Sequence, residues 1–204
     1  MKYFGGCDVG STYTKAVILD ENGKMVADTT IRSKINSEQS AIAAMEEVCK
    51  QAGLKDSKEL EYLIGTGYGR NKVPFADENI SEISCHAMGV HVTDPSVKAI
   101  IDIGGQDVKG ISIDTDGTVK NFAMNDKCAA GIEMAFAKRC FVMAKKAGAT
   151  DSITLTGGCA KNDGLKEAIE HVLKLKVVNL KTDPQLMGAL GAAEYARQKG
   201  MAKK

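Results

Sequence analysis

The strongest constraint on the fold of this chain is an internal repeat. Two segments, GCDVGSTYTKAVILDENGKMV (6–26) and IIDIGGQDVKGISIDTDGTVK (100–120), align with each other without a gap. The matching positions are Asp8 with Asp102, Gly10 with Gly104, Lys15 with Lys109, Asp20 with Asp114, and Gly23 with Gly117. Five polar and glycine matches with apolar positions between them rarely arise by chance. The chain is therefore a duplication of one structural unit.

Each copy has the pattern of a three-stranded meander. A strand leads into a turn of small residues, a second strand follows, and an Asp-x-x-Gly turn leads to a third strand. Glycine supplies the positive φ that such a tight turn needs. After the meanders, the sequence predicts helices at about 38–52, 81–91, 132–147, from 162 onward and at 187–198, with strands in IGT, SITLTGG and VVNL.

Strands that alternate with helices in both halves predict mixed sheets covered by helices, an α/β fold. We expect one lobe at 1–94 and a second at 95–204, with the boundary near Asp94-Pro95. The segment MGALGAAEYA has small residues every three to four positions, so one helix face can approach a neighbour closely. This C-terminal helix is predicted to pack back between the lobes, and simple tight packing is the alternative.

Charge and cysteine content narrow the class of function. Lys and Arg number 27 against 26 Asp and Glu, a net charge of +1 without a basic stripe, which favours a small-molecule ligand over nucleic acid. The N-terminal residues read directly as a strand, and no run is long and apolar enough for a membrane span, so we predict a cytoplasmic protein. Six scattered cysteines without CxxC spacing argue against disulfides and zinc ribbons.

The turns of the two repeats are suited to polyphosphate. Backbone N–H groups can approach phosphate where little side chain intervenes, at Gly10, Ser11 and Thr12 in one copy and at Gly104, Gly105 and Gln106 in the other. Asp8 and Asp102 each end a buried strand and are expected near a hydrated magnesium ion. Lys15 could reach a phosphate as a point charge. The alternative for either hairpin alone is an ordinary turn, but two related copies favour phosphate.

A third candidate lies in LTGGCAKNDGL (155–165). A buried strand ends at Gly157 and Gly158, and a helix is expected to begin near Asn162. Glycines let a flat ring approach the backbone, and a helix N-terminus favours anionic oxygens, so this turn suits adenosine. A plain strand-to-helix turn is the alternative.

Taken together, DVGSTYTKAVILD, IGTGYGR, SEISCHAMG, DIGGQDVKGISID, NDKCAAG, TGGCAKN and GALGAAEYA resemble the BadF/BadG/BcrA/BcrD-type ATPase family, which includes activators of 2-hydroxyacyl-CoA dehydratases. The resemblance covers nearly the whole chain, and DIGGQD with NDKCAAG is its most specific pair. It implies duplicated actin-like, ribonuclease H-like domains of the actin, heat-shock chaperone and sugar-kinase superfamily. It also implies a homodimer that binds ATP and Mg²⁺, with one [4Fe–4S] cluster at the subunit interface that supplies a low-potential electron to a dehydratase.

By position, the resemblance makes Cys128 a cluster ligand and Gln106 a residue that orients water near the γ-phosphate. The chain departs from the family after NDKCAAG, where a long segment carrying a second cysteine is absent. Such a cluster usually needs four thiolates, and one Cys128 from each subunit supplies two. We therefore predict that nucleotide binding is retained while cluster binding and electron transfer are impaired.

Three functions follow from these observations. The first is an ATPase that activates a partner enzyme, with Asp8, Asp102 and Gln106 as the catalytic residues. The second is a small-molecule kinase of the same fold, which would need a base beside a substrate pocket. The third is a cluster-less nucleotide-dependent switch, which the missing segment favours.

Overall fold

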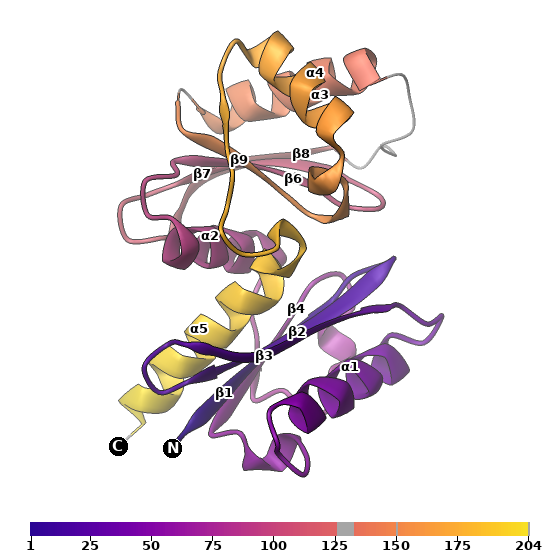
Figure 1. Cartoon of the computed structure of the whole chain (residues 1–204), viewed down its shortest axis with the longest axis vertical. Helices are drawn as coiled ribbons and strands as arrows, with labels where there is room; N and C mark the ends of the chain where they lie inside the picture. Colours follow the sequence, from indigo (N-terminus) through magenta and orange to yellow (C-terminus); the bar gives the residue numbers. More distant parts are fainter. Residues whose placement is uncertain (126–132, 150, 204) are drawn as a thin grey trace. The chain divides into compact units, whose positions relative to one another are not determined.

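The computed structural model describes residues 1–125, 133–149 and 151–203. The chain divides into two compact units, the first formed by 1–89 and 188–204 and the second by 90–187 (Figure 1). Within the described residues, no helix combines the length and the apolar composition that crossing a bilayer requires.

The first unit contains a five-stranded mixed sheet with the order β3-β2-β1-β4-β5. Strands β1 (Tyr3–Val9), β2 (Tyr13–Asp20) and β3 (Met25–Arg32) form an antiparallel meander, and β4 (Tyr62–Thr66) and β5 (Glu78–Asn79) continue the sheet in parallel. The helical elements are α1 (Ser37–Gln51), η1 (Ser57–Glu59), η2 (Arg70–Lys72), α2 (Glu82–Thr93), in which the unit boundary falls, and the C-terminal α5 (Met187–Ala202).

The second unit repeats this sheet with the order β10-β9-β6-β7-β8. Strands β6 (Ala99–Ile103), β7 (Val108–Ile113) and β8 (Val119–Asn125) form the meander, and β9 (Ile153–Thr156) and β10 (Val177–Val178) continue it in parallel. The helical elements are α3 (Glu133–Ala147), η3 (Gly158–Lys161), α4 (Asp163–Leu173) and η4 (Pro184–Leu186).

The two sheets have the same topology, which confirms the duplication and the α/β class. Even the register shift in the meander recurs, between Ile18 and Leu19 in β2 and between Ser112 and Ile113 in β7. Gly23 and Gly117 close the two Asp-x-x-Gly turns with φ of +79° and +83°. The left-handed backbone expected from the sequence is therefore present in both copies.

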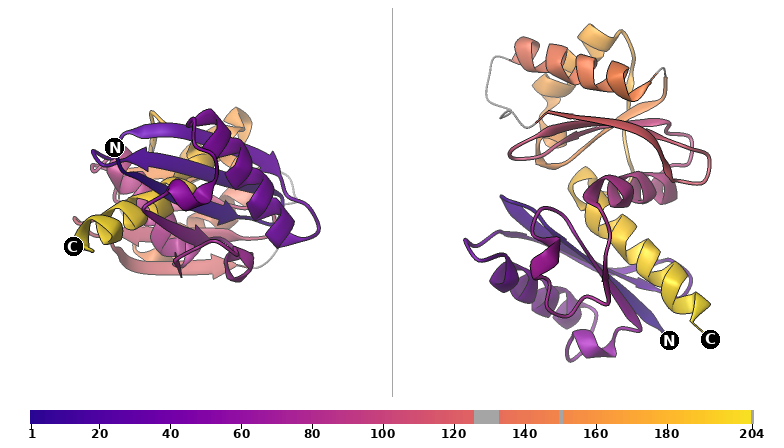
Figure 2. Two further views of the ribbon diagram at one scale, coloured as in Figure 1. Left: turned by 90° about the horizontal axis from the view of Figure 1, so that it is seen from below. Right: turned by 180° about the vertical axis from the view of Figure 1, so that it is seen from behind.

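Helices α1 and α5 both contribute to the packing of the first sheet. The apolar face of α1, including Ala41, Met45 and Val48, packs in one core with Val9 and Ile18 of the strands. Small residues of α5 pack in another cluster around Phe4. Figure 2 shows α5 lying along this sheet, with the chain termini near each other at one end of the first unit.

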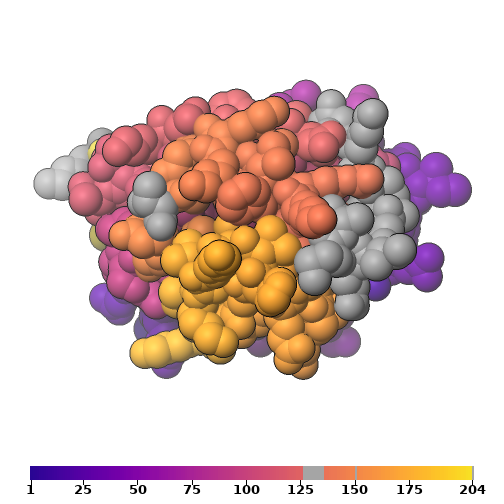
Figure 3. Space-filling model, turned by 90° about the horizontal axis from the view of Figure 1, so that it is seen from above, coloured from indigo at the N-terminus to yellow at the C-terminus, as the bar shows by residue number. Residues whose placement is uncertain are grey.

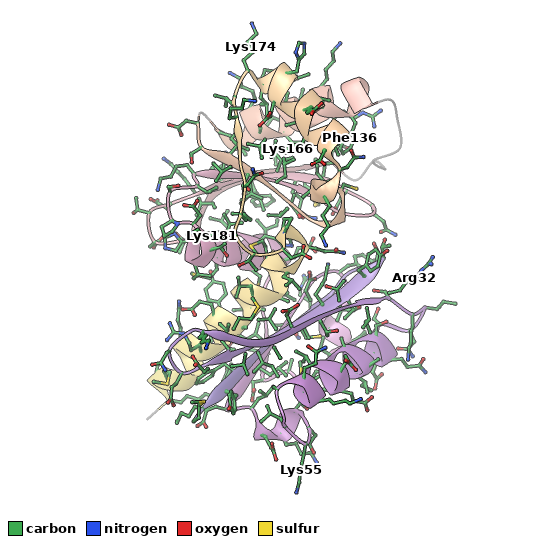
Figure 4. The ribbon with its side chains drawn as sticks, viewed as in Figure 1. Arg32, Lys55, Phe136, Lys166, Lys174 and Lys181 are labelled. Atoms are coloured by element: carbon green, nitrogen blue, oxygen red, sulfur yellow. The ribbon has the colours of Figure 1, made fainter. Side chains whose placement is uncertain are left out.

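Helices α3 and α4 cover one face of the second sheet (Figure 1), and their atoms make up much of the orange surface in Figure 3. Phe136 of α3 is 3% exposed and belongs to this core, whereas Lys174, the left-handed residue that ends α4, projects outward (Figure 4). Burial of the apolar stripe of each helix against the strands provides the main favourable free energy of this unit.

The division into units differs from the expected lobes 1–94 and 95–204 at two places. The first unit ends at Gly89, five residues before the expected boundary, and it takes up 188–204 from the C-terminus. Gly6 and Gly191 explain the second difference, because each lacks the Cβ that would prevent close contact. A Cβ on Gly6 would lie 2.1 Å from the carbonyl oxygen of Ala189, and one on Gly191 would lie 1.8 Å from that of Cys85. The small residues of α5 thus serve tight packing within the first unit.

Candidate functional site

Asp8 lies at the end of the central strand of the first unit and is paired with a lysine. The antiparallel register of β1 and β2 places Lys15 directly opposite Asp8. Lys15 Nζ donates to Asp8 Oδ2 at 3.0 Å, and the aspartate is 3% exposed. Charge-assisted hydrogen bonds of this kind are short and directional. The pair therefore fixes the carboxylate beside the turn that follows β1.

That turn presents small exposed residues. The N–H of Gly10 donates to the carbonyl of Tyr13 and closes the hairpin, while Ser11 and Thr12 are exposed at its tip. The hydroxyl of Ser33 donates to the carbonyl of Gly10 at 2.7 Å, which ties the turn to the end of β3. The amide of Gly10 is thus engaged within the turn, and the tip of the hairpin leaves room for an anionic ligand.

The second unit repeats the arrangement with more partners. Lys109 lies opposite Asp102 in the register of β6 and β7, with Nζ 3.4 Å from Asp102 Oδ2 and 2.7 Å from Asp107 Oδ1. The hydroxyl of Thr156, at the end of β9, donates to Asp102 Oδ1 at 2.7 Å. Asp102 and Lys109 are each 3% exposed. Both oxygens of the Asp102 carboxylate are thereby held in place.

The turn of the second hairpin repeats the first. The N–H of Gly104 donates to the carbonyl of Asp107, and Gly105 and Gln106 are exposed at the tip. Gln106 therefore lies on the hairpin next to the fixed Asp102. Its side chain is accessible to solvent, as the role proposed for it requires.

A glycine with positive φ follows β4 in the first unit and β9 in the second, and each lies close to the aspartate of its unit. Gly67 has a φ of +87°, and a Cβ there would lie 2.4 Å from Asp8 Oδ1. Gly157 has a φ of +85°, and a Cβ there would lie 2.3 Å from the carbonyl oxygen of Ile103 and 3.1 Å from Asp102 Oδ1. Gly157 thus permits close packing around Asp102, besides opening the predicted adenosine turn.

Gly158 begins the short η3 helix, and Asn162 caps the helix that follows. The side-chain oxygen of Asn162 accepts from the N–H of Leu165 at 3.0 Å, which satisfies one of the unpaired N–H groups at the start of α4. The strand, turn and helix predicted at this point are therefore present, and α4 begins at Asp163.

Two neighbours of Asp8 come from the far end of the sequence and from α2. A Cβ on Gly188 would lie 2.7 Å from Asp8 Oδ2 and 2.9 Å from His86 Nε2, so the first turn of α5 passes next to both side chains. Any larger residue at 188 would collide with the carboxylate. The glycine is therefore required by the site as well as by helix packing.

The described cysteines are poor metal ligands. Cys7, Cys49, Cys85 and Cys140 are buried, and burial raises the thiol pKa of Cys49 to about 11 and those of Cys85 and Cys140 to about 12. Burial also raises the thiol pKa of Cys7 and of the partly exposed Cys159. A raised pKa disfavours the thiolate that binds iron. Cys128, the predicted cluster ligand, lies outside the described residues.

Asp107, Thr156 and Gly67 are not among the site residues predicted from the sequence, nor are the two pairs of an aspartate with a lysine. The signal for the pairs was available, because a hairpin that turns at 10–12 places residues 8 and 15 opposite each other. Thr156 could not be found in the same way, since it reaches Asp102 across a parallel pair of strands formed by distant segments.

Comparison with known proteins places this arrangement in a family. Residues 6–137 match the BadF/BadG/BcrA/BcrD ATPase family. The activator of lactoyl-CoA dehydratase from Anaerotignum propionicum is 33% identical over 254 residues, which covers 95% of this chain and 97% of that relative. The (R)-2-hydroxyglutaryl-CoA dehydratase activating ATPase of Acidaminococcus fermentans is 33% identical and covers 97% and 98%. Both alignments are longer than the 204 residues of this chain, so they contain gaps in it, which agrees with a missing segment.

Solved structures agree with the fold. The activator of 2-hydroxyisocaproyl-CoA dehydratase from Clostridium difficile with bound ADPNP has a TM-score of 0.90 at 30% identity and covers 98% of this chain and 96% of that one. A ROK hexokinase from Thermus thermophilus, at 14% identity and a TM-score of 0.58 over 97% and 99% of the two chains, shares the fold alone. The match over 6–137 and the identity over nearly the full length of these relatives show that the chain belongs to the BadF/BadG/BcrA/BcrD ATPase family.

Proposed function

We propose that this protein binds and hydrolyses ATP in order to activate a 2-hydroxyacyl-CoA dehydratase. One observation carries the proposal: each unit ends its central strand in a buried aspartate fixed by a lysine, beside a hairpin with a tip of small or polar exposed residues. Phosphoryl transfer requires positioning and electrostatic stabilisation more than covalent chemistry, and this arrangement can provide both. Relatives aligned over most of the chain are named as dehydratase activators.

We assign the site residues as follows. The exposed tips, Ser11 and Thr12 in one unit and Gly105 and Gln106 in the other, would bind phosphates, together with Lys15. Gly10 and Gly104, expected from the sequence to donate to phosphate, have their N–H groups engaged within the turns and would instead shape the tips. Asp8 and Asp102 would act near magnesium, and Gln106 would orient the attacking water. Gly157, Gly158 and Asn162 would bind the adenosine. The fixed carboxylates fit Mg²⁺, which takes one or two carboxylates together with water and substrate phosphates. When bound, the ion would neutralise charge that develops on the phosphates.

The family cluster is a different case. Among the described residues, no group of three or more His, Cys, Asp or Glu side chains could hold a metal ion, and four of the five described cysteines are buried, so these residues do not fit a [4Fe–4S] site. Only Cys128 is left as a candidate ligand, and a homodimer would bring two copies of it. A nucleotide-dependent switch without a cluster is therefore the second candidate function. The kinase alternative is supported only by fold, at 14% identity.

Two measurements on the purified protein test the proposal. Phosphate release from ATP with Mg²⁺ should be measurable, and a dehydratase component should become active only when this protein and ATP are both present. Absence of Mg²⁺-dependent hydrolysis would refute the proposal. Hydrolysis strongly stimulated by one sugar or acid, with phosphate transferred to it, would support the kinase instead.

Two further measurements address the assembly and the cluster. Anaerobic reconstitution with iron and sulfide should leave no stoichiometric cluster, and light scattering should report a homodimer. A content of about four irons per dimer that is lost in Cys128→Ala would mean that the cluster is bound and would support the electron-transfer function of the family. We propose that the protein is cytoplasmic, because ATP is available in the cytoplasm and cysteine thiols stay reduced there.

A further inference from the structure

Lys109 is enclosed between two carboxylates of the second unit. Its ammonium lies 2.7 Å from Asp107 Oδ1 and 3.4 Å from Asp102 Oδ2. The side chain of Lys109 is 4% exposed, against 24% for that of Asp107 and 5% for that of Asp102. Lys109 is thus less exposed than Asp107 and about as buried as Asp102. Lysine is almost never buried to this extent unless it is paired, so its ion pairs account for its position.

The hairpin is shaped to allow this contact. A Cβ on Gly104 would lie 2.7 Å from Asp107 Oδ1, so the glycine leaves the space that the Asp107 carboxylate occupies. The N–H of Gly104 donates to the carbonyl of Asp107 and fixes the turn. Asp102, Gly104, Asp107 and Lys109 therefore form one structural group within a single hairpin.

The first unit lacks one member of this group, the second carboxylate, although the two hairpins arose by duplication. The position equivalent to Asp107 is Tyr13, and Lys15 pairs with Asp8 alone in the first unit. Thr66, the equivalent of Thr156, donates to the carbonyl of Ile80 and not to the aspartate. The Asp8–Lys15 pair carries no net charge, whereas Asp102, Asp107 and Lys109 together carry one negative charge. The additional carboxylate therefore favours a divalent cation more strongly beside the second hairpin than beside the first.

We propose that Lys109 is a positioning residue for ATP hydrolysis. It holds Asp102 and Asp107 in one geometry and offsets their mutual repulsion, so that Asp102 stays aligned with Thr156 and available to the magnesium of Mg·ATP. This inference rests on the proposed function, and it adds two residues, Lys109 and Asp107, to the site. In this proposal Lys109 acts through the two carboxylates and not by direct contact with the nucleotide.

The test compares Lys109→Met with Lys109→Arg and with the double variant Asp107→Asn/Lys109→Met. The double variant restores the local charge of the natural protein without the lysine. Lys120→Met, which removes an exposed lysine from the same unit, is the matched control. The measurements are kcat and KM for Mg·ATP, binding of a fluorescent ATP analogue in EDTA, and the thermal unfolding midpoint with and without Mg·ATP.

If Lys109 positions the carboxylates, kcat should fall by about 10- to 100-fold in Lys109→Met, because small displacements of catalytic groups have effects of this size. Binding of the analogue in EDTA should change by less than about 3-fold, since the lysine does not contact phosphate. The double variant should regain the unfolding midpoint but not kcat, and Lys109→Arg should regain part of kcat.

Two results would overturn the inference. A kcat in Lys109→Met close to that of Lys120→Met would mean that the lysine does not position the site. Recovery of both stability and kcat in the double variant would mean that it only balances charge. If Lys109→Met does not fold, the kcat of the double variant is compared with that of Lys120→Met instead. Failure of the natural protein to hydrolyse or bind Mg·ATP is a distinct result, which would refute the proposed function and this inference together.

Discussion

Asp102 is a buried carboxylate held by Lys109 and Thr156 at once. Replacing it with asparagine keeps the shape and leaves Lys109 paired with Asp107, so the fold should persist. We expect kcat for ATP hydrolysis to fall by about 100-fold, the usual effect of losing one preorganised charged group. Steady-state phosphate release measures this, with the exposed Asp116→Asn as control. Turnover within a factor of two would remove Asp102 from the site.

Asn162 has two separable roles, capping α4 and binding nucleotide. Asn162→Ala should lower the free energy of unfolding by about 1 kcal/mol, because the cap of α4 is lost. Asn162→Asp keeps a capping oxygen and so should keep the stability, but its negative charge faces the proposed nucleotide and should weaken ATP binding by about 10-fold. Urea denaturation and calorimetric titration separate the two effects. Unchanged affinity in both variants would confine Asn162 to capping.

At the level of secondary-structure elements, the contact between β1 and α5 leaves no room for an added methyl group. In Gly6→Ala, the new methyl group would meet the backbone of Ala189 and Ala193 at 2.1 and 2.4 Å. Backbone cannot rotate away, so α5 must shift, and the free energy of unfolding should fall by about 3 kcal/mol. Gly5→Ala is the matched control, since its methyl group meets only the flexible side chains of Leu60 and Leu63. Equal losses in both variants, measured by urea denaturation, would contradict this account.

The individual elements could be predicted from the sequence because their signals are local. The helix expected at 38–52 is α1 at Ser37–Gln51, and the helix expected at 187–198 is α5 at Met187–Ala202. The unit to which α5 belongs cannot be predicted in the same way, because small residues every three to four positions indicate a close contact but do not identify its partner. That partner is set by Gly6, far away in the sequence.

The same limit applies to the site. Asp8, Asp102 and the glycine turns could be found from the duplication alone. The third partner of the second carboxylate, Thr156, depends on the pairing of β6 with β9, which brings together residues 54 positions apart. Asp107 was overlooked because its equivalent in the first copy is Tyr13, so the comparison of repeats did not mark it.

At the level of the whole molecule, the cysteines offer a simple test of the structure. A thiol reagent at pH 8 should modify Cys159 and Cys128 at most, because Cys7, Cys49, Cys85 and Cys140 are buried and burial raises their pKa. All six should react in guanidinium chloride. Cys128→Ala identifies the contribution of that residue. Rapid reaction of more than two thiols in the native protein would contradict the burial of these side chains.

The discontinuous first unit also has a consequence for synthesis on the ribosome. Residues 90–187 leave the exit tunnel as a contiguous block and can fold as soon as they emerge. Residues 1–89 emerge earlier, yet they lack the last helix, which packs against Gly6 and Phe4. Residues 1–89 therefore keep part of their sheet uncovered until residues 188–204 have left the tunnel.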